Sequence, residues 1–200
     1  EDAVEGCEEL ARLLDLPKVP HVIEGFDISH ISGTLTVASM VVSVNGLPAP
    51  QRYRRFRVRT VQGIDDPMSM AEIVRRRYAR CLADGLGLPD LVMVDGGITQ
   101  LRAARAELIK LGLPALPTVG LAKRFEEIVV DRGEVASVLL PRDSEALKVL
   151  IRLRDEAHRF AITYNRSLRL KKIRESVLDE IEGIGEARKT LLLRQFGSVR

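Results

Sequence analysis

Residues 90–97 read Asp-Leu-Val-Met-Val-Asp-Gly-Gly, a short apolar strand that ends on an acid and two glycines. An Ala-rich segment with helical spacing follows at residues 99–111, and residues 117–122 predict a second buried strand. A strand, a helix and a strand in this order predict two parallel strands joined by a right-handed crossover. Asp95 then lies at the carboxyl end of a parallel strand, the edge where open α/β sheets bind ligands.

Segments upstream of this unit predict an antiparallel meander. Residues 21–29 and 34–44 are rich in β-branched side chains, and Asn45-Gly46 after the second segment favours a hairpin turn. Residues 52–58 alternate as a third strand, and residues 69–83 have helical spacing. The fold class is therefore α/β: a mixed sheet of three antiparallel strands followed by parallel strands, flanked by helices. Shorter signals predict a helix at 8–16 and a hairpin at 129–140.

The C-terminal stretch has a different pattern. Ser144 is a suitable N-cap for a long helix reaching about Tyr164. Residues 176–181 and 186–196 then predict two short helices around the turn Glu182-Gly183-Ile184-Gly185, the start of a second, truncated module. The expected organisation is an N-terminal helix and linker over 1–20, a main domain over 21–174, and this module over 175–200.

Composition limits the class of protein. A chain of 200 residues that is 46% apolar is a globular domain with a small appendage, and no apolar run approaches the 18 residues that a bilayer span needs. The two cysteines lack metal-type spacing, which favours a reducing, cytoplasmic location. The chain begins at Glu1 without a basic-then-apolar leader, so we expect a fragment of a longer protein without a secretion signal.

Charge is unevenly distributed although the net charge is only +3. Residues 1–26 hold two basic and seven acidic groups, residues 51–80 hold nine and three, and residues 151–200 hold twelve and seven. Two basic blocks of this size suit either a polyanion such as nucleic acid or ordinary solvated helix faces.

Two acids fall where a divalent cation could bind. Asp27 interrupts an apolar strand, and a buried carboxylate is costly unless something compensates its charge. Asp27 and Asp95 on adjacent strands would repel each other, and a cation with oxygen ligands would relieve that repulsion and act as a Lewis acid on a phosphodiester. The alternative is that Asp27 sits at a bulge and Asp95 begins a turn.

Other candidate side chains are less specific. His158 lies in a helix dense in charge, as a structural residue, a metal ligand or a proton carrier. Asp66 either adds a third carboxylate or, with Asp65, caps the helix that follows. Lys123, at the end of a parallel strand, either steadies a phosphate or is solvated in a loop. His30 is expected to point away from the acids, and the pair Gly96-Gly97 to form a turn.

The glycine turn near the C-terminus could bind a phosphate. Gly183 and Gly185 expose backbone N–H groups ahead of a helix N-terminus, and Arg188 and Lys189 follow one turn later. A plain helical hairpin is the alternative.

Several motifs, in order and without large gaps from about residue 10 to 200, resemble the UvrC family, the incision nuclease subunits of bacterial nucleotide excision repair. Gly25, Pro67 and Ile98-Thr99 depart from the usual pattern, and Pro67 affects the placement of Asp66. The motifs are residues 26–30 (FDISH), 36–40 (TVASM), 53–56 (YRRF), 75–78 (RRRY), 94–97 (VDGG), 120–123 (GLAK) and 154–163 (RDEAHRFAIT).

This resemblance implies an RNase H-like endonuclease domain that cuts the damaged strand of duplex DNA on the 5′ side of a lesion with Mg²⁺ or Mn²⁺. It implies a catalytic set of Asp27, Asp95 and His158, with Asp66 as a further acid in some members. It further implies that the tail is the first helix-hairpin-helix of a tandem pair. The partners implied are UvrB, with UvrA acting before it, while the other UvrC domains would lie upstream of this chain.

Two rival functions remain at this stage. A catalytically silent DNA-binding scaffold would use only the glycine hairpin and the basic blocks. An RNase H-like nuclease acting on RNA would carry the same sheet and acids, so only a substrate test separates it from a DNA endonuclease.

Overall fold

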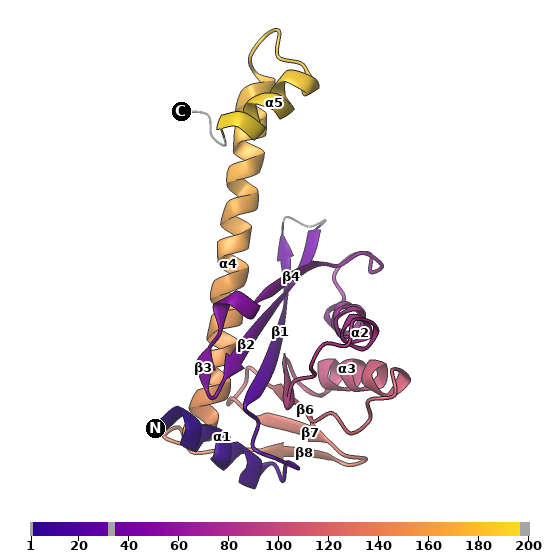
Figure 1. The fold of residues 1–200 in the computed structure, drawn as a ribbon, viewed down its shortest axis with the longest axis vertical. Helices are drawn as coiled ribbons and strands as arrows, with labels where there is room; N and C mark the ends of the chain where they lie inside the picture. The colour runs from indigo at the N-terminus through magenta and orange to yellow at the C-terminus, as the bar shows by residue number, and fades with distance from the viewer. Residues whose placement is uncertain (1, 32–34, 197–200) are drawn as a thin grey trace. The chain divides into compact units, whose positions relative to one another are not determined.

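The computed structural model describes residues 2–31 and 35–196, and these divide into two compact units between Ala161 and Ile162 (Figure 1). The first unit is built on a sheet of eight strands in the order β3-β2-β1-β5-β6-β7-β8, with β4 paired to β2. The strands are β1 (Val22–Ile31), β2 (Leu35–Val44), β3 (Leu47–Pro48), β4 (Arg54–Arg57), β5 (Leu91–Asp95), β6 (Thr118–Leu121), β7 (Ile128–Asp131) and β8 (Val135–Val138). The helices are α1 (Asp2–Leu13), α2 (Asp66–Ala83), α3 (Ile98–Lys110), α4 (Glu145–Asp179) and α5 (Glu186–Phe196), with a 3₁₀ turn at Pro50–Arg52.

Strand pairing makes the sheet mixed, as the sequence predicts. β1 pairs antiparallel with β2 and parallel with β5, β5 pairs parallel with β6, and β6 pairs antiparallel with β7. In the register of β1 and β5, Phe26 lies opposite Val94. Asp27 and Asp95 are the next residues on each strand, so the two acids lie side by side where the parallel pairing of β1 and β5 ends.

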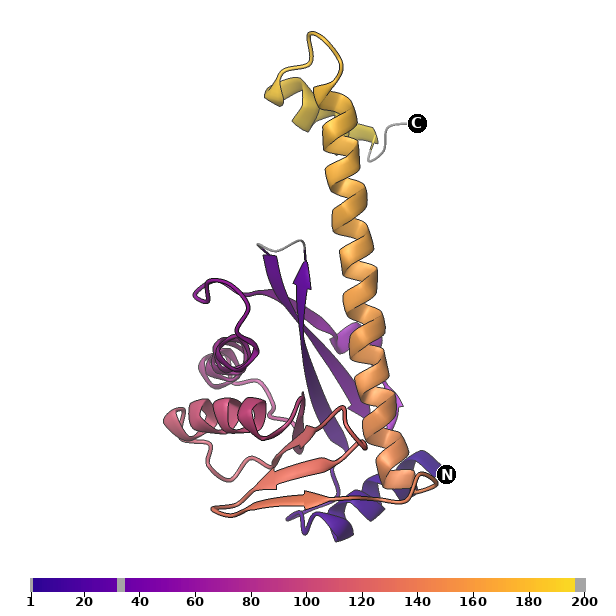
Figure 2. The same cartoon turned by 180° about the vertical axis from the view of Figure 1, so that it is seen from behind.

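Helices cover both faces of β1, because successive side chains of a strand point to opposite faces. Phe26 meets Tyr78 of α2 with ring centroids 6.1 Å apart, so the even-numbered residues of β1 face α2. Gly25 lies against Leu153 of α4, whose Cδ2 would be 2.9 Å from a Cβ at this glycine. Asp27 has the parity of Gly25 and therefore points to the face that α4 covers. Figure 2 shows α2 and α3 side by side, away from α4.

The ends of several elements differ from the sequence predictions. α4 runs from Glu145 to Asp179, so the separate helix predicted at residues 176–181 is wrong. Residues 165–175 contain neither glycine nor proline, and nothing in them stops a helix. β1 extends to Ile31 rather than ending at Ser29. Residues 32–34, after β1, and residues 197–200, at the end of the module expected over 175–200, lie outside the described residues.

No helix within residues 2–31 and 35–196 combines the length and apolarity that crossing a membrane requires.

Candidate metal centre

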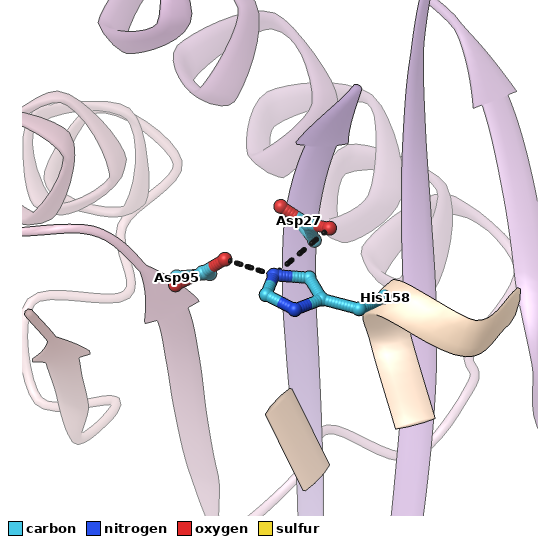
Figure 3. Close-up of side chains that lie close together, drawn as sticks. All are labelled: Asp27, Asp95 and His158. Carbon is cyan, nitrogen blue, oxygen red and sulfur yellow. Dashed lines mark hydrogen bonds and ion pairs between the residues drawn. The ribbon is translucent and has the colours of Figure 1, made fainter. Parts of the chain in front are cut away.

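Three side chains from three elements meet at the carboxyl edge of the central strands (Figure 3). Asp27 comes from β1, Asp95 from the last position of β5, and His158 from α4. His158 Nε2 lies 2.7 Å from Asp95 Oδ2, within hydrogen-bond distance, and 3.5 Å from Asp27 Oδ2. One potential ligand atom from each residue lies within 4.8 Å of the other two, so the three side chains could hold a single ion.

Burial sets the electrostatics of this cluster. The Asp95 side chain is 1% exposed and that of Asp27 is 10% exposed, whereas His158 is 40% exposed. Burial first, and then the charge of Asp95 and a hydrogen bond with it, raise the pKa of Asp27 to about 7, although His158 and Lys123 oppose the shift. Two ionised carboxylates are therefore costly here unless a cation lies beside them.

One carboxylate oxygen has no partner. Asp95 Oδ1 is buried and accepts no hydrogen bond within the described part of the chain. Buried acceptors are normally satisfied, and an orphaned one calls for an explanation. Carboxylate oxygens with one imidazole nitrogen are donors suited to Mg²⁺ or Mn²⁺. The residues present therefore fit a divalent cation.

Asp27 and Asp95 line a cavity of about 250 Å³, and Asp66 lines it as well. Gln100 and Lys123 also contribute to its wall. The helix-capping role falls to Asp65, whose Oδ1 accepts from the Met68 N–H at 3.0 Å. Asp66 is the first residue of α2 and its side chain is 43% exposed. The structure thus places a third carboxylate in the cavity, outside the Asp27, Asp95 and His158 cluster.

His30 points to the face of β1 opposite Asp27, and it contacts Asp66, which the sequence analysis did not predict. Its Nε2 lies 2.5 Å from Asp66 Oδ1, and its Nδ1 lies 3.0 Å from Thr36 Oγ1. β1 continues two residues beyond the predicted end, and His30 shares the face of Phe26 that α2 covers. Alternation along β1 would have indicated this contact. Gln100, in the first turn of α3, is another cavity residue that the sequence analysis missed.

The turn after Asp95 approaches a neighbouring strand closely. Gly96 has a φ of +154°, and a Cβ at Gly120 of β6 would lie 2.7 Å from the Gly96 carbonyl oxygen. Lys123 follows β6 and lines the cavity beside this turn.

The second unit holds the other predicted binding residues. Gly183 has a φ of +86°, and a Cβ at either Gly183 or Gly185 would meet nothing within 4 Å. The backbone N–H groups of Arg188 and Lys189 both donate to the Gly185 carbonyl at 3.0 Å. The Arg188 guanidinium donates to the Gly183 carbonyl and Lys189 Nζ to Asp179 Oδ1. The two basic side chains are thus engaged within the hairpin, and their binding role stays a prediction.

The raised pKa of Asp27 predicts a pH-dependent stability in the metal-free protein. A carboxyl that is harder to ionise in the folded chain stabilises it at low pH, and this stability is lost as pH rises from about 4 to about 7. Asp27→Asn should therefore raise the free energy of unfolding in EDTA at pH 8 by roughly 1–3 kcal/mol, and the gain should disappear near pH 4. Urea unfolding across this range measures it. Asp155→Asn, an exposed position on α4, is the control, and a gain independent of pH would contradict the electrostatic explanation.

The fold resembles solved nucleases only in part. One of them is Ciona intestinalis endonuclease V (D234N), crystallised with a 23mer DNA containing an inosine. The match covers 60% of this chain and 56% of that chain, with 18% identity and a TM-score of 0.41. A likeness at this level carries no argument about function.

Curated relatives match along almost the whole chain. UvrABC system protein C of Methanococcoides burtonii is 51% identical over 200 residues, which are 100% of this chain and 33% of that protein. The protein of the same name from Moorella thermoacetica is 46% identical over 194 residues, 96% of this chain and 32% of that protein. The chain spans about a third of the length of these relatives. The model of the UvrC RNase H endonuclease domain matches residues 11–162. The chain therefore belongs to the UvrC RNase H endonuclease domain family, and its mixed sheet has the RNase H-like fold.

Proposed function

We propose that the chain hydrolyses a phosphodiester bond of DNA with a bound divalent cation, Mg²⁺ or Mn²⁺. The observation that carries this proposal is the meeting of Asp27, Asp95 and His158 in one cluster, in which one atom from each could bind the same ion. A cation bound there would offset the mutual repulsion of the two acids, whose buried carboxylates include one oxygen without a partner.

Asp27 and Asp95 would be the anionic ligands. When bound, the cation supplies a Lewis acid that polarises a phosphoryl oxygen of the substrate. The protein fixes the direction of both carboxylates through the β1–β5 register, so little rearrangement is needed at the moment of reaction.

His158 would complete the ligand set rather than carry a proton. Its Nε2 is the ring atom that faces both acids, and it must lose its proton before it can donate electrons to a cation. Two carboxylates alone would leave a cation sparsely coordinated, which is why we favour a ligand role for the imidazole.

Asp66 and Lys123 would act on the substrate side of the cavity. Asp66, held by His30, presents a further carboxylate that could orient the attacking water. Lys123 would contact a phosphate of the bound strand, because its side chain is exposed at the cavity rim and positively charged.

The glycine hairpin would bind DNA without reading its sequence. Gly183 and Gly185 leave the backbone at the start of α5 open, and a helix N-terminus favours an anion. Arg188 and Lys189 would exchange their partners within the hairpin for phosphates.

The relatives' name suggests the setting in which this chemistry occurs. The name UvrABC system protein C describes one component of a system of several proteins. This chain matches about a third of the length of that component. We infer that the reaction is the incision on the 5′ side of a lesion in nucleotide excision repair, in the cytoplasm. The partners would be damaged duplex DNA and UvrB, with UvrA acting earlier.

Asp27→Ala should abolish this incision while leaving DNA binding nearly intact, because it removes a cation ligand and relieves a like-charge pair. In the full-length protein assembled with UvrA and UvrB on a duplex with one defined lesion, the 5′ incision should slow at least about 100-fold and the 3′ incision should persist. End-labelled DNA separates the two products. Asp155→Asn is the control, and a normal 5′ rate in Asp27→Ala would remove Asp27 from the site. Preference for an RNA strand would favour the rival substrate.

His158→Ala tests the choice between ligand and proton carrier. If His158 is a ligand, the Mn²⁺ concentration for half-maximal cutting should rise, and saturating Mn²⁺ should restore much of the rate. If it carries a proton, the rate should fall at every Mn²⁺ concentration, and one limb of the pH profile should disappear. Cutting rates measured against metal concentration and pH decide between them. Wild-type behaviour in both titrations would exclude His158 from the site.

Substituting valine for both Gly183 and Gly185 should weaken DNA binding rather than the chemical step. Valine at a positive φ is strained, and its bulk covers the backbone N–H groups. The slope of log affinity against log salt should become shallower by about one to two, because fewer phosphates are engaged. Gly85 and Gly87 give a matched control, since Gly85 also has a positive φ and both positions are open. An unchanged slope would leave the hairpin a purely structural role.

A further inference from the structure

The connection between β6 and β7 has an unusual backbone next to the candidate metal centre. Phe125 has a φ of 62° and Glu126 a φ of 53°, so two successive side-chain-bearing residues lie in the left-handed region. Such residues are strained, and they persist only where the surrounding structure holds them. Strained residues of this kind gather at functional sites.

Contacts on both sides fix this connection. The Ala122 N–H donates to the Glu127 carbonyl at 2.8 Å, and this hydrogen bond closes the loop of residues 123–126. Arg154 of α4, with a side chain 14% exposed, pairs with Glu126 at 3.1 Å. The loop therefore presents Phe125 from a fixed backbone.

Phe125 is displayed rather than buried. The residue is 68% exposed, although a phenylalanine normally gains free energy from leaving water. The Arg124 guanidinium lies 5.0 Å from the ring centroid. An exposed aromatic ring with an arginine beside it is a typical platform for a nucleobase.

Phe125 lines a groove of about 640 Å³. Leu139, which is 63% exposed, contributes a second apolar side chain, and Arg142 adds a positive charge. Lys123 lines both this groove and the cavity of Asp27 and Asp95. Because Glu126 is already paired with Arg154, the groove presents an excess of positive charge.

We propose that this groove, the Phe125 groove, receives a nucleobase of the DNA strand next to the phosphate that is cut. The base would stack on Phe125, and the phosphates on either side of it would lie along Lys123 and Arg142. A flat apolar surface between cations matches the alternation of bases and phosphates in a single strand. The inference rests on the proposed function, since it assumes that the strand is cut at the metal centre.

A base analogue tests the Phe125 groove directly. The probe is a DNA duplex with a short unpaired bubble, carrying one 2-aminopurine at successive positions and bound to the chain in Ca²⁺. One position should change its fluorescence on binding. Phe125→Ala should remove this change and weaken binding about 5- to 100-fold, whereas Phe125→Tyr should retain both. An abasic nucleotide at that position should weaken binding to the unsubstituted chain but not to Phe125→Ala.

Controls separate this proposal from the proposed function. Ile109→Ala removes another exposed apolar side chain, on α3, and should behave as the unsubstituted chain does. If the unsubstituted chain binds and cuts DNA while Phe125→Ala does so equally well, the Phe125 groove is not a base site, and its apolar surface would serve a protein partner. Absence of DNA binding by the unsubstituted chain would overturn both proposals.

Discussion

The parallel pairing of β1 with β5 is the constraint on which the site depends. Its register places Asp27 and Asp95 side by side where the parallel pairing ends. Burial and mutual repulsion disfavour two negative charges at this point. The sheet could place neutral side chains there at lower cost. In the proposed function a cation would turn this unfavourable arrangement into a binding site, so the instability of the pair and its affinity for metal would have the same origin.

Helix packing then adds the remaining groups to this edge. Gly25 allows α4 to lie close to β1, and the same helix supplies His158 to the two acids. The opposite face of β1 reaches α2, where His30 meets Asp66 at the first residue of the helix. One strand thus organises the proposed ligands on one face and a further acid on the other. Phe125 lies in the loop that follows the carboxyl end of β6, the strand next to β5.

Much of this arrangement could be predicted from the sequence because it follows from short-range patterns. The apolar strand before Asp95 and the acid within the first strand locate both carboxylates at strand positions, and family motifs point to His158. The contact between His30 and Asp66 was missed because the first strand was expected to end at Ser29, whereas β1 continues to Ile31. The left-handed Phe125 has no local signal, since neither glycine nor asparagine occupies that position, and tertiary contacts alone impose its backbone.

The most direct test of a cation site at Asp27, Asp95 and His158 is the anomalous scattering of Mn²⁺ in crystals of the chain. The account predicts a peak within about 2.0–2.4 Å of an oxygen from each aspartate and of His158 Nε2, and its loss in Asp27→Asn crystals. The result that would contradict such a site is an Mn²⁺ peak elsewhere, for example between Asp66 and His30, with no anomalous density at Asp27 and Asp95.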